Sequence, residues 1–239
     1  MSAVGASAVG FVLSASRCGL PALGGNIVPS GRNQAGHFRD LVEAIVSGNT
    51  ATAIKLLDAW PQLTSARATQ GATRQAPERG YFADIRHYMY EGDTALHMAA
   101  AAFQTGIAEQ LMARGADVRA RNRRGAQPLH YAVDGGPGLP AWDPVAQTDI
   151  ITMLIRAGAD PNAVDRSGVA PLHRAVRNRC AAAVAALIDG GADPNAPNKR
   201  GSTPVLLATW STGRGGSGSP AAKAQQQEIL HVLEKHGAV

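Results

Sequence analysis

The stretch GDTALHMAA, which begins at Gly92, decides the fold. Related segments begin at Gly125 (GAQPLHYAV), Gly168 (GVAPLHRAV) and Gly201 (GSTPVLLAT), so the spacings are 33, 43 and 33 residues. A second series, RGADVRA, AGADPNA, GGADPNA and the terminal HGAV, recurs downstream of each segment. Two offset series that recur in phase indicate one repeated supersecondary unit, with an insertion in the longer interval.

Each unit has the signals of two short helices. Thr203 precedes Pro204, which places a capping hydroxyl before a proline at the first helical position. Further along a unit, AAAVAALIDGG places Val184, Leu187 and Ile188 on one helix face. This second helix is expected to end at a left-handed glycine, at Gly115, Gly158 and Gly191. The aspartates that follow these glycines, Asp117, Asp160 and Asp193, suit the turn chemistry of the next link.

These motifs resemble the ankyrin-repeat family over residues 37–239. The resemblance implies an all-α repeat solenoid of about five helix-turn-helix units, joined by short β-hairpin fingers. It also implies that the histidine of each LH motif forms hydrogen bonds within and between repeats. The sequence departs from the family pattern at Gln127 and Ala170, which replace a capping Thr and cost about 1 kcal/mol each. It departs again at Leu206, which replaces the histidine of the last unit.

The repeats set the expected domain organisation. Residues 1–36 are expected to be a disordered tail or a weak export signal, since no positive charge precedes the short apolar patch. A single repeat domain follows over 37–239, with degenerate capping units at both ends. We expect units at about 37–64, 92–122, 123–164, 165–197 and 198–239, a long finger insertion at 65–91, and loop insertions at 135–148 and 213–227.

The insertion at 65–91 is rich in aromatic residues. It holds Tyr81, Phe82, Tyr88 and Tyr90 within ten residues. One interpretation is that these side chains cover the seam between the first unit and the next repeat. The other is that an elongated finger presents Tyr and Arg to a partner, since both residue types are enriched at binding hot spots. The two interpretations are compatible.

Basic residues are concentrated at the fingers, in a chain of net charge +5. The finger before Gly125 carries five arginines: Arg114, Arg119, Arg121, Arg123 and Arg124. Arg166, Lys199 and Arg200 occupy equivalent places in later fingers, so stacking predicts a basic ridge. The ridge has three interpretations: solvated finger tips, a surface for an acidic protein, or a surface for nucleic acid.

The sequence offers no catalytic or metal-binding pattern. His97, His130 and His173 recur once per repeat, which places them too far apart to share one zinc ion. No nucleophile motif or P-loop is present, and His87 and Asp84 in the insertion have no evident nucleophile beside them. We therefore expect no enzyme activity, no cofactor and no metal. The two cysteines cannot form a disulfide framework, which favours a reducing, cytoplasmic location over export.

The sequence therefore predicts a non-enzymatic scaffold that binds a protein through its concave and finger surface. The alternative is binding of nucleic acid or another acidic ligand through the basic ridge, and a purely structural spacer also stays open. We expect a monomer without a membrane span. The candidate contact residues are Arg119, Arg121, Arg123 and Arg124 from the basic finger, Tyr81, Tyr88 and Tyr90 from the insertion, and Met98, Tyr131 and Arg174 from the first helices.

Overall fold

The computed structural model describes residues 34–139, 142–210 and 219–238. They belong to one compact unit that runs from Arg32 to Val239. The tail or export signal expected over residues 1–36 lies outside the described residues, apart from the start of the first helix at Gln34. Parts of the two expected loop insertions, residues 140–141 and 211–218, also lie outside them.

Ten α-helices in the described residues form five consecutive pairs. The pairs are α1 (Gln34–Val46) with α2 (Thr50–Ala59), α3 (Ala95–Ala101) with α4 (Thr105–Ala113), α5 (Pro128–Ala132) with α6 (Pro144–Arg156), α7 (Pro171–Asn178) with α8 (Ala181–Asp189), and α9 (Pro204–Thr209) with α10 (Pro220–Lys235). Two 3₁₀ helices, η1 (Pro61–Thr64) and η2 (Pro77–Gly80), lie between the first and second pairs. No helix in this described part has the length and hydropathy needed to cross a bilayer.

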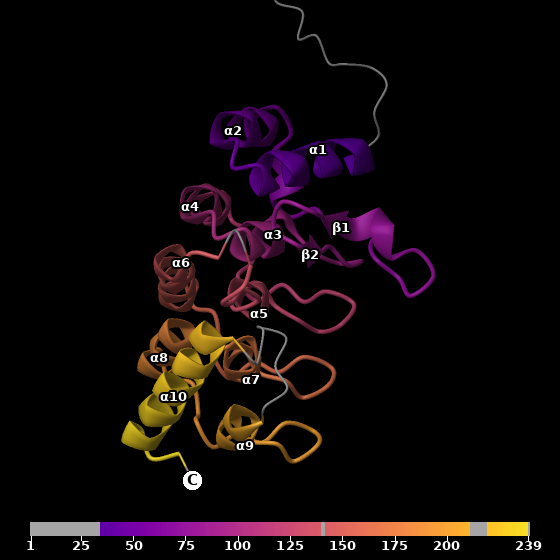
Figure 1. Cartoon of the computed structure of the whole chain (residues 1–239). Helices are drawn as coiled ribbons and strands as arrows, with labels where there is room; N and C mark the ends of the chain where they lie inside the picture. The colour runs from indigo at the N-terminus through magenta and orange to yellow at the C-terminus, as the bar shows by residue number, and fades with distance from the viewer. Residues whose placement is uncertain (1–33, 140–141, 211–218, 239) are drawn as a thin grey trace, which may run out of the picture. The chain divides into compact units, whose positions relative to one another are not determined.

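The pairs stack so that like helices meet like helices (Figure 1). The first helices pack in the order α1, α3, α5, α7 and α9, and the second helices in the order α2, α4, α6, α8 and α10. Linking loops project on the side of the first helices (Figure 1). One unit cannot bury its apolar face alone, so this stacking supplies the core. The all-α repeat solenoid expected from the sequence is confirmed.

The second helices end as the sequence predicts. Gly115, Gly158 and Gly191 have φ angles of 90°, 95° and 92°, in the left-handed region that glycine adopts without steric penalty. The aspartate two residues after each glycine accepts a hydrogen bond from the backbone N–H two residues further on, at 2.8 to 2.9 Å. These Asx-type turns lead the chain out of the helix and into the finger.

The fingers between later repeats are hairpin-shaped turns without paired strands. Asn122 N–H donates to Ala126 O at 3.0 Å and Asp165 N–H to Val169 O at 3.0 Å, and a second backbone bond, from Gly125 N–H to Asn122 O or from Gly168 N–H to Asp165 O, tightens each turn. Among the described residues, the paired strands are β1 (Tyr81–Phe82) and β2 (His87–Tyr88), which form a short antiparallel hairpin in the insertion. The β-hairpin character expected of every finger is therefore strongest in the inserted one.

Two helices begin inside segments that were expected to be loops. Helix α6 starts at Pro144 rather than after residue 148, and Asp143 accepts hydrogen bonds from Val145 and Ala146 N–H. Helix α10 starts at Pro220, within the expected loop 213–227, and Ser219 accepts from Ala222 N–H. In both cases a capping side chain followed by proline starts the helix, a signal that the loop assignment overlooked.

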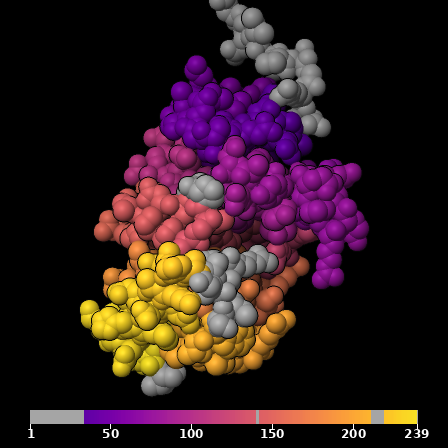
Figure 2. Space-filling view, viewed as in Figure 1, coloured from indigo at the N-terminus to yellow at the C-terminus, as the bar shows by residue number. Residues whose placement is uncertain are grey.

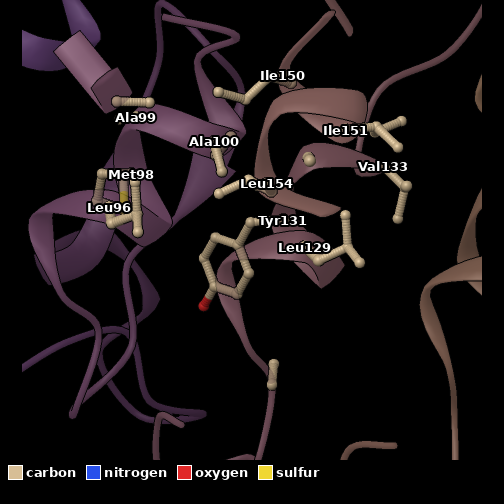
Figure 3. Close-up of a cluster of buried hydrophobic side chains, with 14 of the residues drawn as sticks. Leu96, Met98, Ala99, Ala100, Leu129, Tyr131, Val133, Ile150, Ile151 and Leu154 are labelled. Carbon is tan, nitrogen blue, oxygen red and sulfur yellow. The ribbon is translucent and has the colours of Figure 1, made fainter. Parts of the chain in front are cut away.

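Small and branched apolar side chains fill the core between the repeats (Figure 3). Ala99 and Ala100 of α3 are fully buried and allow α5 to approach closely, while Leu129 of α5 and Leu154 of α6 fill the space between helix pairs. Tyr131 lies in the same cluster, with its hydroxyl pointing away from the aliphatic side chains (Figure 3). Truncating a buried leucine such as Leu129 to alanine is expected to cost about 2–5 kcal/mol.

Candidate partner-binding surface

Equivalent positions of successive fingers form a column that we call the finger column: Tyr90, Arg123, Arg166 and Lys199. Backbone bonds hold the fingers together, because Arg123 N–H donates to Glu91 O and Arg166 N–H to Arg124 O, both at 2.9 Å. A Cβ on Gly125 would lie 3.0 Å from Arg166 N, so the glycine permits this close approach. The fingers are therefore fixed against one another before any partner binds.

Two of the predicted contact arginines hold neighbouring repeats together. Arg119 Nε donates to Gly158 O at 2.7 Å, and Arg121 Nη1 donates to Val164 O at 2.7 Å and to Gly125 O at 3.0 Å. Both residues are exposed, but their guanidinium groups already have acceptors. Arg67 makes the same kind of bond to Arg121 O, at 2.8 Å. These arginines therefore connect repeats, and they are less available to a ligand than their exposure suggests.

The aromatic insertion partly covers the repeats and partly faces solvent. Phe82 and Met89 are buried in the core. Tyr81 and Tyr88 remain 39% and 38% exposed, with ring centroids 4.9 Å apart across the hairpin. The insertion projects on the side where the fingers lie (Figure 2). The segment thus buries some of its apolar side chains against the repeats, as one interpretation expected, and leaves two tyrosines exposed to a partner, as the other expected.

The insertion is attached to the first helices through His87. Its Nε2 lies 3.1 Å from Asp134 Oδ2, and its ring lies 4.6 Å from that of Tyr131, centroid to centroid. Asp134 Oδ2 also accepts from Arg174 Nη1 at 3.0 Å, and Arg174 Nη2 donates to Asp165 Oδ2 at 3.0 Å. Burial would raise the pKa of Asp134, but the Arg174 guanidinium and the His87 hydrogen bond lower it to about 2. The predicted contact residue Arg174 is therefore engaged in ion pairs inside the protein.

Met98 and Tyr131 are not on the surface, which corrects their expected placement. Met98 is fully buried, and Tyr131 is 2% exposed with the His87 ring of the insertion packed against it. Tyr131 OH donates to Asp93 Oδ2 at 2.8 Å and accepts from Asn122 Nδ2 at 2.9 Å. The Tyr131 hydroxyl therefore has its hydrogen-bonding partners inside the protein.

A basic cleft of about 540 Å³ lies between the insertion and the fingers. Among the described residues it is lined by Ala72, Thr73, Arg74, Pro77, Tyr88, Tyr90, Arg123, Arg124 and Arg166. Two arginines contact the ring of Tyr90, whose centroid lies 5.8 Å from Arg123 Cζ and 4.8 Å from Arg124 Cζ. Arg123 Nη2 also donates to Ala72 O at 2.6 Å. The cleft thus brings together four of the predicted residues: Arg123, Arg124, Tyr88 and Tyr90.

The recurring histidines are structural. In each repeat, the N–H of the helix-capping residue (Thr94, Gln127 or Ala170) donates to histidine Nδ1, at 3.1 to 3.3 Å. Nε2 therefore carries the proton and donates to a carbonyl of the next repeat, Ala126, Val169 or Ser202, at 3.1 to 3.2 Å. Burial lowers the pKa of all three rings, that of His130 to about 3. The expected bonds within and between repeats are confirmed.

Comparison with known protein families agrees with this geometry. A family model described as ankyrin repeat matches residues 91–123 and 124–166, and one described as ankyrin repeats (many copies) matches residues 154–208. The chain is an ankyrin-repeat protein. No curated protein matches the sequence. Ankyrin repeats generally mediate protein–protein interaction.

Sequence reasoning did not select Arg74 and Arg166 as contact residues of the ankyrin stack. The repeat register could have found Arg166, because it is equivalent to Arg123 in the next finger. Arg74 has no repeat equivalent, since it lies in the insertion, and it reaches the cleft only because that segment folds against the fingers. Groups of His, Cys, Asp and Glu able to hold a metal ion do not occur among the described residues.

Proposed function

We propose that this ankyrin-repeat protein is a non-enzymatic interaction scaffold that binds an acidic segment of a protein partner in the basic cleft. One observation carries the proposal. Within the described residues, the guanidinium groups of Arg74, Arg124 and Arg166 have neither a carboxylate nor a carbonyl as a hydrogen-bonding partner, although they line one cleft. We call such side chains open, meaning that they have no hydrogen-bonding partner among the described residues. Arginines and tyrosines are enriched among the residues that contribute most to binding at protein interfaces.

The cleft is the preferred part of the finger surface because its donors are open. Arg119 and Arg121 are occupied by carbonyls of the next repeat, and Lys199 Nζ donates to Arg166 O at 2.6 Å. An acidic segment that approached those groups would have to displace existing bonds. At Arg124 and Arg166 it would form new charge-assisted bonds without that loss.

The proposal assigns no catalytic step to the chain. His97, His130 and His173 have both ring nitrogens engaged with the backbone. Cys180 is buried, and burial raises the pKa of its thiol to about 12, which disfavours the nucleophilic thiolate. These bonding states support a structural role for the groups that chemistry would otherwise use.

The test is quantitative affinity capture from the native cell with the full chain as bait. Baits are the wild type, the double charge reversal Arg124→Glu with Arg166→Glu, and the matched control Arg200→Glu in the last finger. We expect each reversed arginine to cost about 2 kcal/mol, so recovery of true partners falls about 1000-fold in the double variant. Recovery should change little with Arg200→Glu. An identical set of proteins on all three baits would contradict the proposal.

Nucleic-acid binding is the second candidate, favoured by the regular placement of Arg123, Arg166 and Lys199 in successive fingers. It predicts a steep linear fall of log affinity with log salt concentration for a single-stranded or duplex oligonucleotide. It also predicts that Arg200→Glu weakens binding as much as Arg166→Glu, because the ridge would act as a whole. A flat salt response eliminates this candidate.

We propose that the scaffold acts as a monomer in the cytoplasm. The location rests on the cysteines, since the buried Cys180 is a free thiol and the other, Cys18, lies outside the described residues. Light scattering at several concentrations and fractionation of cells that express the tagged chain test the two statements separately. A mass that rises with concentration, or a tagged chain found outside the cytoplasm, would contradict the corresponding statement.

A further inference from the structure

We propose that the basic cleft recognises a phosphomonoester dianion, presented as a phosphorylated side chain of the protein partner. This inference rests on the proposed function and narrows it from acidic segments in general to phosphorylated ones. The proposal rests on three observations: the number of guanidinium donors without a partner among the described residues, the hydrogen bonds that fix the backbones of Arg124 and Arg166, and the single cleft that these donors line.

The cleft offers more charge and more donors than one carboxylate can use. Four arginines line it, and its described lining includes no aspartate, glutamate or histidine. Three of the four, Arg74, Arg124 and Arg166, have no acceptor for their guanidinium groups among the described residues. A carboxylate has two oxygens and one charge, whereas a phosphomonoester has three acceptor oxygens and a charge of about −1.5 to −2 at pH 7. The dianion therefore matches this donor set better.

The arginines are positioned before a ligand arrives. The side chain of Arg123 donates to Ala72 O, and those of Arg123 and Arg124 both lie over the Tyr90 ring. Arg124 N–H donates to Asn122 Oδ1 at 2.8 Å, and Arg124 O accepts from Arg166 N–H at 2.9 Å. The backbones of the two open finger arginines are thus locked to each other. Preorganised donors lose less entropy on binding, and planar guanidinium forks suit phosphate oxygens.

The open donors favour one phosphate group over a nucleic-acid backbone. A nucleic acid would need cations without hydrogen-bonding partners along the whole finger column, but Lys199 Nζ donates to Arg166 O and Arg123 Nη2 to Ala72 O. The cleft volume of about 540 Å³ is within the range of small-molecule binding sites, so it has room for a phosphate group together with the side chain that carries it. A second cleft of the described residues, of about 410 Å³, includes Asp40, Glu43 and Asp84 in its lining, and their charge would repel an anion.

The experiment measures fluorescence anisotropy of short labelled peptides titrated with the full chain. One peptide carries a single phosphotyrosine and a second a single phosphoserine, both between neutral residues. Matched peptides carry glutamate or the unmodified residue at the same place. We expect the better phosphopeptide to bind at least about tenfold more tightly than its glutamate counterpart, because the dianion accepts an additional charge-assisted hydrogen bond.

The pH dependence supplies a second readout. The phosphate loses its second charge as the pH falls through about 6, so affinity for the phosphopeptide should fall between pH 7.5 and 5.5, while affinity for the glutamate peptide stays flat. The described lining of the cleft has no histidine or carboxylate that would titrate in this range, so the change reports the ligand.

Variants locate the binding site. Arg124→Ala and Arg166→Ala should each weaken the phosphopeptide about tenfold, and Arg200→Ala, in a finger outside the cleft, less than twofold. Thermal unfolding of each variant checks that the repeats remain folded. Equal affinity for phosphopeptide and glutamate peptide would overturn this inference and leave the proposed function standing. Failure of every anionic peptide to bind would overturn both, as would a single-stranded oligonucleotide that binds more tightly and is weakened equally by Arg166→Ala and Arg200→Ala.

Discussion

Two columns of this protein recur at the same repeat spacing but differ in how their polar groups are satisfied. One consists of His97, His130 and His173 in the first helices. The other is the finger column, whose members lie seven residues before each histidine, at Tyr90, Arg123 and Arg166. Every histidine has both ring nitrogens bonded to backbone groups. The finger column is only partly satisfied, because Arg123 Nη2 donates to Ala72 O and Lys199 Nζ to Arg166 O. The guanidinium group of Arg166, like those of Arg74 and Arg124 in the same cleft, has no hydrogen-bonding partner among the described residues.

The difference shows that recurrence alone does not identify a functional residue. Both columns repeat because the backbone repeats, and both are polar. The histidine column is buried and closed, so it serves the stability of the stack. The cleft arginines are open, so they serve whatever approaches from outside. Changes in the first column should alter unfolding with little effect on binding, and changes at the cleft should do the reverse.

The largest expected effect is the loss of stability in acid. Burial lowers the pKa of the three histidines in the folded protein, that of His130 to about 3, while in the unfolded chain each titrates near 6.5. The unfolded state therefore binds more protons below pH 6.5, and stability present above that pH is lost as the pH falls toward 3. Each histidine contributes up to about 1.4 kcal/mol per pH unit. Urea unfolding between pH 7 and 4.5 measures this, and a flat free energy of unfolding would contradict the account.

Removing one member of the histidine column should have the next largest effect. His130→Ala leaves Gln127 N–H without a partner, removes one of the two hydrogen bonds to Val169 O and opens a cavity at a fully buried position. The expected loss of unfolding free energy is about 3 kcal/mol. His231→Ala, at an exposed histidine of α10, is the control and should change the free energy of unfolding by less than about 0.5 kcal/mol. Equal losses of unfolding free energy in the two variants would contradict the stabilising role of the histidine column.

Within the fingers, a smaller effect should separate the engaged arginines from the open ones. Arg121→Ala removes hydrogen bonds to Val164 O and Gly125 O, and should lower the free energy of unfolding by about 1 kcal/mol. Arg124→Ala removes no such bond and should leave the free energy of unfolding within about 0.5 kcal/mol of wild type. Chemical denaturation of both variants measures the effect on stability. The peptide titration should give the opposite order, with Arg124→Ala weakening binding more than Arg121→Ala.

The smallest effect concerns a helix cap. Ala170 occupies the capping position that Thr94 and Thr203 fill in other repeats, and Thr203 Oγ1 accepts from Leu206 N–H. Ala170→Thr should therefore stabilise the protein by about 1 kcal/mol without changing binding. Differential scanning calorimetry measures the shift in melting temperature. An unchanged or lower melting temperature would contradict this prediction.

The repeat pattern predicted the fold because each unit repeats local signals. The glycine C-caps, the aspartate turns and the histidine bonds all follow from residues close in sequence or one repeat apart. The burial of Met98 and Tyr131 could not be predicted, because it depends on how the insertion packs over the first helices. The engagement of Arg119 and Arg121 depends on carbonyl positions in the next repeat, which composition does not reveal. The cleft likewise requires the insertion to fold against fingers that are distant in sequence, as the bond from Arg123 Nη2 to Ala72 O shows.

The most direct test compares arginines whose guanidinium groups donate to carbonyls with arginines whose guanidinium groups have no partner in the described part of the chain, by measuring each arginine separately. Phenyl phosphate is titrated into the full ¹⁵N-labelled chain, and the Nε–Hε resonances of the arginines are followed by NMR. We predict saturable shifts for Arg74, Arg124 and Arg166, with little change for Arg119 and Arg121, whose guanidinium groups are bonded to carbonyls. Equal, non-saturating shifts at every exposed arginine, or no shift at the cleft arginines, would contradict the account.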